Sequence, residues 1–142
     1  MNKHAYQKLL TANDTGETGS HQAGLHIPKT NGEFLEFLPA LDPREKNPDS
    51  WLECVDEASR IWKFRFVHYN NKLHSIKGTR NEFRITHMTA YFRSVGATEG
   101  DTFIISKNEG ESLYTIKVNS ENKSGSSTSI TPVKLKGWTK VY

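Results

Sequence analysis

The segment "RIWKFRFVHY", residues 60–69, decides the fold class because it alternates aromatic and basic side chains. Aromatic residues stand at every second position from Trp62 to Phe66, with Lys63 and Arg65 between them. This period of two is typical of a half-buried β-strand that packs its aromatic side on a core. We therefore predict a strand here, with Lys63 and Arg65 together on its exposed face.

Similar short stretches occur on both sides of this segment. Asn70-Asn71 is a good turn pair, so Lys72–Ile76 is the expected hairpin partner. The Ser-rich residues Asn119–Ser129 are expected to form a loop. Short strands between Gly, Asn and Ser turns are typical of a barrel or a sandwich. Further strands are predicted at Trp51–Val55, Thr102–Ser106, Leu113–Val118 and Ile130–Leu135.

Two short helices are predicted among the strands. Asn31 is a suitable N-cap for "GEFLEFL", and Thr86 for a second helix that stops at Gly96. The apolar residues at helical spacing are Phe34, Leu35 and Leu38 in the first helix and Met88, Tyr91, Phe92 and Val95 in the second.

The composition is that of a soluble protein. With 142 residues, 35% hydrophobic and 25% charged, the chain can bury a core, and we expect one domain spanning residues 1–142. It has no apolar run of about 18 residues and no long apolar N-terminal segment, so we expect a cytoplasmic protein without membrane contact. The single cysteine, Cys54, is expected to be a small buried hydrophobe.

Charge is unevenly distributed along the chain. From Glu33 to Glu57, eight acidic and two basic residues give a net charge of −6. From Arg60 to Arg93, eight basic residues and one acidic residue give +7. A basic window with interleaved aromatic residues is typical of a nucleic-acid-binding surface. A solvated basic face is the simpler alternative.

Sequence signatures of catalysis are incomplete. The glycine-rich "GETGS", residues 16–20, lacks the lysine of a phosphate-binding loop. Pro48-Asp49 could begin a metal-dependent nuclease motif, but the only Glu-x-Lys is Glu121–Lys123, within the Ser-rich segment. The histidines have no zinc-site spacing. We therefore expect no catalytic residues, metal or cofactor in this chain by itself.

Two separated stretches carry a family resemblance. The segments "ANDTGETGSHQAGLHIP", residues 12–28, and "GTRNEFRIT", residues 78–86, resemble the signature stretches of the N-terminal effector DNA-binding domain of the EcoRII restriction endonuclease family. Thr86–Ser106 also resembles the plant B-three domain. The resemblance implies a mainly β fold with short helices, a DNA-binding pseudobarrel that is an open barrel of about seven strands.

The resemblance further implies two arms that grip the major groove of DNA, at Asp14–His26 and Lys77–Arg84. Glycines in the first arm let the backbone approach the duplex. The contacts to phosphates and base edges expected from the first arm are Ser20, His21, Gln22 and His26. Lys63 and Arg65 are expected to contact phosphates from the strand between the arms.

The second arm is the expected site of base recognition. Arg80 and Arg84 suit guanine, and Asn81 suits adenine. Glu82 can accept a hydrogen bond from cytosine N4, or it can orient a neighbouring arginine. Lys77 and Thr79 complete the expected contacts of this arm.

The function favoured by these features is sequence-specific binding of double-stranded DNA. The chain would be the recognition or effector domain of a type II restriction endonuclease, attached to a magnesium-dependent nuclease domain elsewhere in a longer polypeptide. Its site would be short and GC-containing, similar to CC(A/T)GG. A free-standing DNA-binding transcriptional regulator with the same fold is the alternative, and a compact nuclease with an unrecognised site is a more distant one.

Overall fold

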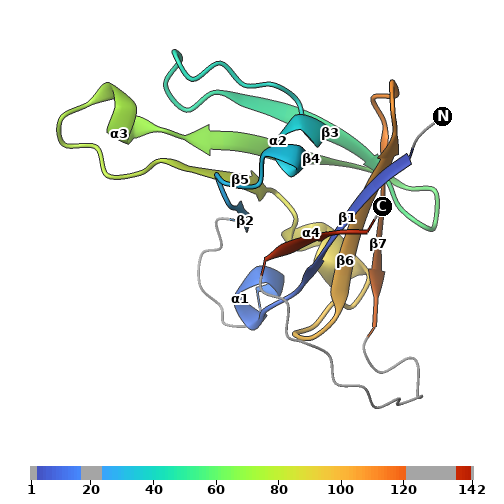
Figure 1. Cartoon of the computed structure of the whole chain (residues 1–142). Coiled ribbons are helices and arrows are strands. Elements are labelled where there is room, and N and C mark those ends of the chain that lie inside the picture. The colour runs from blue at the N-terminus through green and yellow to red at the C-terminus, as the bar shows by residue number, and fades with distance from the viewer. Residues whose placement is uncertain (1–2, 17–23, 121–136, 142) are drawn as a thin grey trace.

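The computed structural model describes residues 3–16, 24–120 and 137–141. Within these residues, eight strands form one sheet in the order β2-β5-β4-β3-β7-β6-β1-β8 (Figure 1). The strands are β1 (Lys3–Leu9), β2 (Leu25–Ile27), β3 (Asp49–Val55), β4 (Ile61–Tyr69), β5 (Glu82–Thr86), β6 (Thr102–Asn108), β7 (Tyr114–Asn119) and β8 (Trp138–Lys140). The helices are α1 (Ala12–Thr15), α2 (Gly32–Phe37), α3 (Asn71–His74) and α4 (Thr89–Ser94).

The sheet curves into a nearly closed barrel. The pairs between neighbouring strands are antiparallel, except that β3 and β7 run parallel at Cys54 and Tyr114. The edge strands β2 and β8 are joined by a side chain, because the indole Nε1 of Trp138 donates to the backbone oxygen of His26 at 3.0 Å. This bond links the two ends of the sheet across the opening of the barrel.

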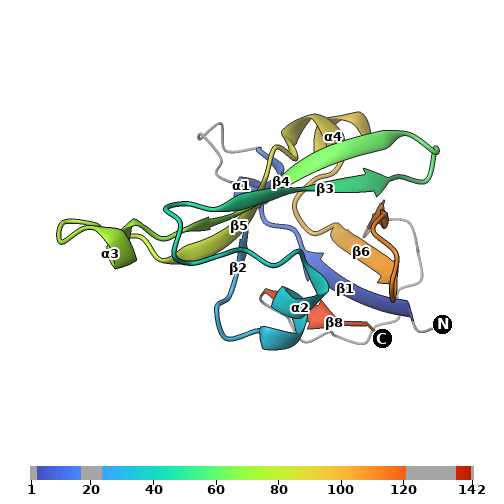
Figure 2. The same ribbon diagram turned by 90° about the horizontal axis from the view of Figure 1, so that it is seen from above.

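Aromatic side chains fill the barrel. The helices α2 and α4 lie on opposite sides of it (Figure 2). Phe64, Phe66 and Phe103 point inward and are almost fully buried. Phe34 of α2 packs on Trp138, with ring centres 4.5 Å apart, and α4 contributes its own aromatic residues at the other end. Burial of this apolar surface is the main source of stability for a domain of this size.

The predicted strands agree with the structure except at the hairpin. β4 lies where alternation predicts it, and β3, β6 and β7 lie at the further stretches predicted as strands. Lys72–Ile76 does not return as a strand, because Asn71–His74 forms the single helical turn α3, and β4 instead pairs with β5. The prediction at Ile130–Leu135 falls outside the described residues, as does the Ser-rich segment beyond Ser120, while Asn119 itself ends β7.

One predicted helix is confirmed and the other begins later than expected. The Asn31 side chain accepts from the backbone N–H of Phe34 at 3.3 Å and caps α2. Thr86 is not a cap, because it is the last residue of β5 and His87 turns the chain with a φ of 66° before α4 begins at Thr89. The helix stops before Gly96 as predicted.

Two further expectations concern single residues. Val95 does not belong to the buried face of α4, since 39% of its surface is exposed. Cys54 is fully buried. Burial, assisted by Glu53, raises the pKa of its thiol to about 12. Cys54 is therefore the small buried hydrophobe that the sequence predicts.

None of the helices in the described part of the chain has the length and apolar character that crossing a membrane requires.

Candidate nucleic-acid interface

The strands β2, β5, β4 and β3 present one exposed face, which we call the outer face. Because Phe64 and Phe66 point into the barrel, Lys63 and Arg65 point away from it, as predicted. The register sets Arg84 of β5 beside His26 of β2. The outer face therefore includes His26, Lys63, Arg65, Tyr69, Glu82 and Arg84, together with Asp49, Trp51 and Glu53 of β3. Thr86 belongs to the same face but is buried.

Three charged side chains form a cluster at the β5 end of the second arm. Arg80 donates from Nε and Nη2 to the same oxygen of Glu82, at 2.9 and 2.6 Å. Arg84 donates from Nη2 to the other Glu82 oxygen at 3.3 Å. Burial raises the pKa of Glu82, but the bonds from the two arginines outweigh it and hold the pKa below its usual value. The carboxylate is therefore ionised at neutral pH and orients both arginines.

Tyr69 completes this cluster, although it was not among the contact residues predicted from the sequence. The guanidinium carbon of Arg80 lies 4.0 Å from the centre of the Tyr69 ring, a cation–π contact. Tyr69 is paired opposite Glu82 across β4 and β5, so the ring and the carboxylate hold Arg80 together. The signal in the sequence was the same alternation that places Arg65 outside, since Tyr69 is four residues further along the strand.

Asn81 points to the opposite side of the sheet from its neighbours. Its Oδ1 lies 2.8 Å from Nε2 of His68, and His68 stacks on Phe83 with ring centres 4.1 Å apart. His68 is 6% exposed, so this contact is largely removed from solvent. The structure thus brings Arg80, Glu82 and Arg84 together and holds Asn81 on the inner side, beneath them.

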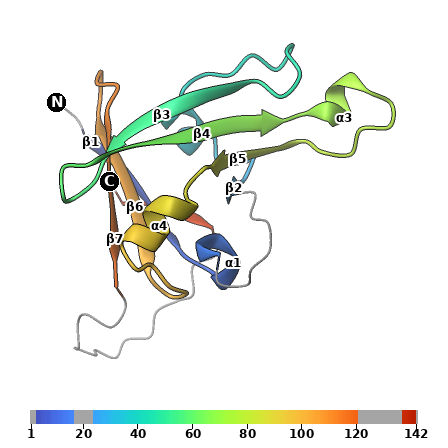
Figure 3. The ribbon, with the colours of Figure 1, turned by 180° about the vertical axis from the view of Figure 1, so that it is seen from behind.

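The backbone of the second arm is held by close contacts at its base. The N–H of Arg80 donates to Oδ1 of Asn71 at 2.8 Å, and the N–H of Lys72 donates to the Arg80 oxygen at 2.9 Å. A Cβ at Gly78 would lie 2.1 Å from the Asn71 oxygen, so only glycine fits there. Lys77 and Thr79 are exposed on this arm. Figure 3 shows the arm extending away from the barrel, past β2.

The first arm is anchored at both ends, although residues 17–23, which include the predicted contacts Ser20, His21 and Gln22, lie outside the described residues. Asp14 and Thr11 form a capping box at α1. Gly24 has a φ of 92°, and a Cβ there would lie 2.0 Å from the Ile85 oxygen. Arg84 donates from Nη1 to the Gly24 oxygen at 3.1 Å. The last predicted contact, His26, is exposed on β2.

The outer face continues across β4 to β3. Arg65 donates from Nε to Asp49 at 2.6 Å, which raises the pKa of the guanidinium. Lys63 lines an open hollow with Trp51 and Glu53. Lys63, Lys72 and Lys77 take part in none of the ion pairs found among the described residues. Their charges are therefore available to an anionic ligand.

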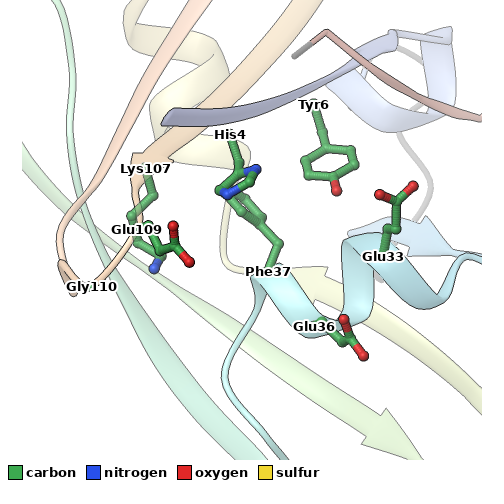
Figure 4. A pocket seen from close by; sticks show the side chains of 8 residues that line it. All are labelled: His4, Tyr6, Glu33, Glu36, Phe37, Lys107, Glu109 and Gly110. Carbon is green, nitrogen blue, oxygen red and sulfur yellow. The ribbon is translucent and has the colours of Figure 1, made fainter. Parts of the chain in front are cut away.

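A second hollow lies between β1, α2 and the β6–β7 connection (Figure 4). It is lined by His4, Tyr6, Glu33, Glu36, Phe37, Lys107, Glu109 and Gly110. Burial and then Glu33 raise the pKa of Tyr6, and three carboxylates surround the opening. This hollow is unfavourable for a polyanion. In residues 3–16, 24–120 and 137–141, no cluster of three His, Cys, Asp or Glu side chains is placed to hold a metal.

The barrel and its projecting arm define a B-three-like pseudobarrel. The fold is similar to that of FUS3 in the structure of the Arabidopsis FUS3–DNA complex, with a TM-score of 0.58 and 18% identity, covering 80% of this chain and 94% of that one.

Sequence comparison identifies the family. The family model described as restriction endonuclease EcoRII, N-terminal, matches residues 1–109, and the chain belongs to this family. It is 38% identical over 116 residues to the type II restriction enzyme EcoRII of Escherichia coli, which covers 75% of this chain and 26% of that enzyme. The chain thus matches about a quarter of the enzyme's length.

Proposed function

We propose that this chain binds double-stranded DNA at a specific short sequence, as the recognition or effector domain of a type II restriction endonuclease whose nuclease domain lies elsewhere in a longer polypeptide. The observation that carries the proposal is the cluster of Arg80, Glu82 and Arg84, with Tyr69 against Arg80, on an exposed basic face. Family membership and the fold similarity to a protein seen in complex with DNA support it.

Base recognition is assigned to the two arginines. A guanidinium fork matches O6 and N7 of guanine in the major groove, and each such pair contributes about 1–3 kcal/mol of discrimination. Arg80 is the more accessible of the two, since 41% of its side-chain surface is exposed against 23% for Arg84. Glu82 then acts mainly by holding the two guanidinium groups in position. It can also accept a hydrogen bond from a cytosine amino group.

Asn81 is given a supporting role in this proposal. Because its Oδ1 is engaged by His68 on the inner side of the sheet, its contribution is to fix the base of the second arm, and its contact with adenine stays a prediction from the sequence. Lys63, Arg65 and Lys77 are assigned to phosphates, since phosphate contacts position a protein on the duplex without reading sequence.

The first arm is proposed to enter the same groove from the other side of the outer face. One described end, α1, contacts α4, and the other end, Gly24, lies against Ile85 of β5. Arg84 ties the second arm to Gly24. Contacts from Ser20, His21 and Gln22 stay sequence predictions, and His26 is the contact proposed from β2. A site similar to CC(A/T)GG is proposed on family similarity alone. Magnesium would be required only by the attached nuclease domain.

Selection of bound duplexes from a random pool, followed by sequencing, tests this proposal. We expect enrichment of one short, GC-containing motif, with no cleavage when magnesium is added. A pool that shows no enriched motif, or magnesium-dependent cutting that survives repurification of the chain, would contradict the proposed function.

A further inference from the structure

The connection between β4 and β5, which leads into the second arm, displays two aliphatic side chains to solvent. We call residues 72–77 the arm tip. Ile76 is 101% exposed, and Leu73 is 55% exposed. The tip lies beyond the ends of β4 and β5, at the point of the arm farthest from the barrel (Figures 1 and 3). Neither side chain contributes to the buried core.

The backbone of the arm tip is nevertheless fixed by local hydrogen bonds. The N–H of Ser75 donates to the Asn71 oxygen, and the N–H of Gly78 donates to the Ser75 oxygen, both at 3.0 Å. The His74 ring nitrogen Nε2 lies 3.0 Å from the backbone oxygen of Pro43, which ties the tip to a neighbouring loop. The backbone of the tip is therefore held in place, while Leu73 and Ile76 remain in contact with water, which is unfavourable for apolar surface.

The chain segment that carries the two side chains has only basic charged residues, although the loop to which it is tied also contains Asp42 and Glu45. From Asn70 to Arg80 the chain contains Lys72, Lys77 and Arg80, and no acidic residue. Neither lysine takes part in an ion pair among the described residues. The two lysines favour an occupant that carries negative charge close to an apolar group, and the major groove of DNA combines both.

We propose that Ile76 and Leu73 read thymine in the major groove by contact with its C5-methyl group, beside the base pairs read by Arg80. This inference rests on the proposed DNA binding. The thymine methyl is the apolar group that base edges expose in that groove. Lys72 and Lys77 contact the flanking phosphates. The arm tip thus extends sequence specificity to A·T pairs next to the guanines.

The test replaces each thymine of the selected duplex in turn with deoxyuridine, which lacks only the methyl group. Affinities are measured by fluorescence anisotropy for the native chain, Ile76→Ser, Leu73→Ser and the control Leu113→Ser. Leu113 is an exposed leucine in the β6–β7 connection, far from the arm. For the native chain, at least one deoxyuridine should weaken binding about fourfold, the effect of one buried methyl group. In Ile76→Ser or Leu73→Ser, the same deoxyuridine replacement should not weaken binding any further. In the control Leu113→Ser, it should weaken binding as much as in the native chain.

Several outcomes would overturn the inference. It fails if no deoxyuridine weakens binding, if its effect is equal in all variants, or if the selected site contains no thymine. It also fails if the serine variants change only the oligomeric mass of the free protein, because the tip would then be a protein contact. Arg80→Ala, measured in parallel, separates the two proposals. If Arg80→Ala loses its preference for the selected duplex but the deoxyuridine effect does not depend on Ile76 or Leu73, this inference alone is refuted. If the native chain itself shows no sequence preference, both this inference and the proposed function are refuted.

Discussion

Arg80 and Glu82 lie two residues apart at the start of β5 and share two hydrogen bonds of 2.9 and 2.6 Å. The second oxygen of the same carboxylate receives Arg84. A carboxylate on a face proposed to meet phosphates lowers general affinity for DNA, because like charges repel. Its presence is explained if the orientation of the two arginines contributes more to recognition of the selected sequence than one positive charge would.

Glu82→Gln should raise affinity for scrambled DNA, because it removes one negative charge from the outer face. It should also lower discrimination between the selected and scrambled duplexes by about fivefold, since it weakens two ion pairs worth on the order of 1 kcal/mol. Titration of both duplexes at one fixed salt concentration measures the two effects. Unchanged discrimination would mean that Glu82 does not orient the arginines.

Arg80→Ala and Arg84→Ala should each weaken binding to the selected duplex by roughly ten- to a hundredfold, the value of one lost guanine contact. Binding to scrambled DNA should fall much less. The same titrations provide the measurement. An arginine whose removal weakens both duplexes equally is a phosphate contact, and its assignment to base recognition would then be wrong.

Tyr69→Leu should reduce discrimination about two- to fivefold, because the cation–π contact with Arg80 is worth about 0.5–1 kcal/mol at a partly exposed site. Tyr69→Phe keeps the ring and should bind as the native chain does. Competition between selected and scrambled duplexes distinguishes the two variants. Equal losses in both would point instead to the Tyr69 hydroxyl group.

Salt dependence tests the assignment of the lysines to phosphates. If about five phosphates are neutralised, log affinity should fall against log salt with a slope of roughly −4 to −5. Lys63→Ala should reduce the magnitude of that slope by about one and weaken all sequences alike. A slope near zero would mean that the basic residues between Arg60 and Arg93 do not contact phosphates and form only a solvated face.

Stability at acid pH should depend on Asp56, a buried carboxylate. Burial raises its pKa, but bonds from the Trp62 indole and from the backbone N–H groups of Arg60 and Ala58 outweigh this and lower the pKa below its usual value. The carboxylate therefore stabilises the fold above its unfolded pKa, and this contribution is lost as pH falls towards the lowered value.

Urea unfolding of the native chain and Asp56→Asn, at pH 7 and at progressively lower pH, measures this contribution. The native chain should be more stable at pH 7, and the difference should shrink in acid. A difference that stays constant with pH would show that the loss comes from packing rather than from the charge.

The sequence predicts the strands whose pattern is regular. β4 alternates from Trp62 to Phe66 and was placed correctly. β1 was missed because Lys8, a buried cation paired with Asp14, interrupts its apolar face. β8 has three residues, too few for any period. β2 and β5 were missed as strands because their residues were assigned to the arms.

The candidate site was predicted only in part. The resemblance indicated the second arm, and the alternation along β4 gives the face of Tyr69. The partners of Tyr69 and His68 follow from the pairing of β4 with β5, which is not visible in either strand alone. The same pairing turns Asn81 to the inner side, whereas its neighbours in sequence face outward. Register decides which face each side chain occupies, and a shift of one residue would reverse it.

The most direct test of sequence-specific DNA binding is a paired titration of the native chain at about 0.15 M salt. The duplex selected from the random pool is compared with a scrambled duplex of the same composition. The arginine cluster predicts at least about a thousandfold tighter binding to the selected duplex, the lower end for specific recognition. Equal affinities for the two duplexes would contradict the central claim, because phosphate contacts alone would then account for all binding.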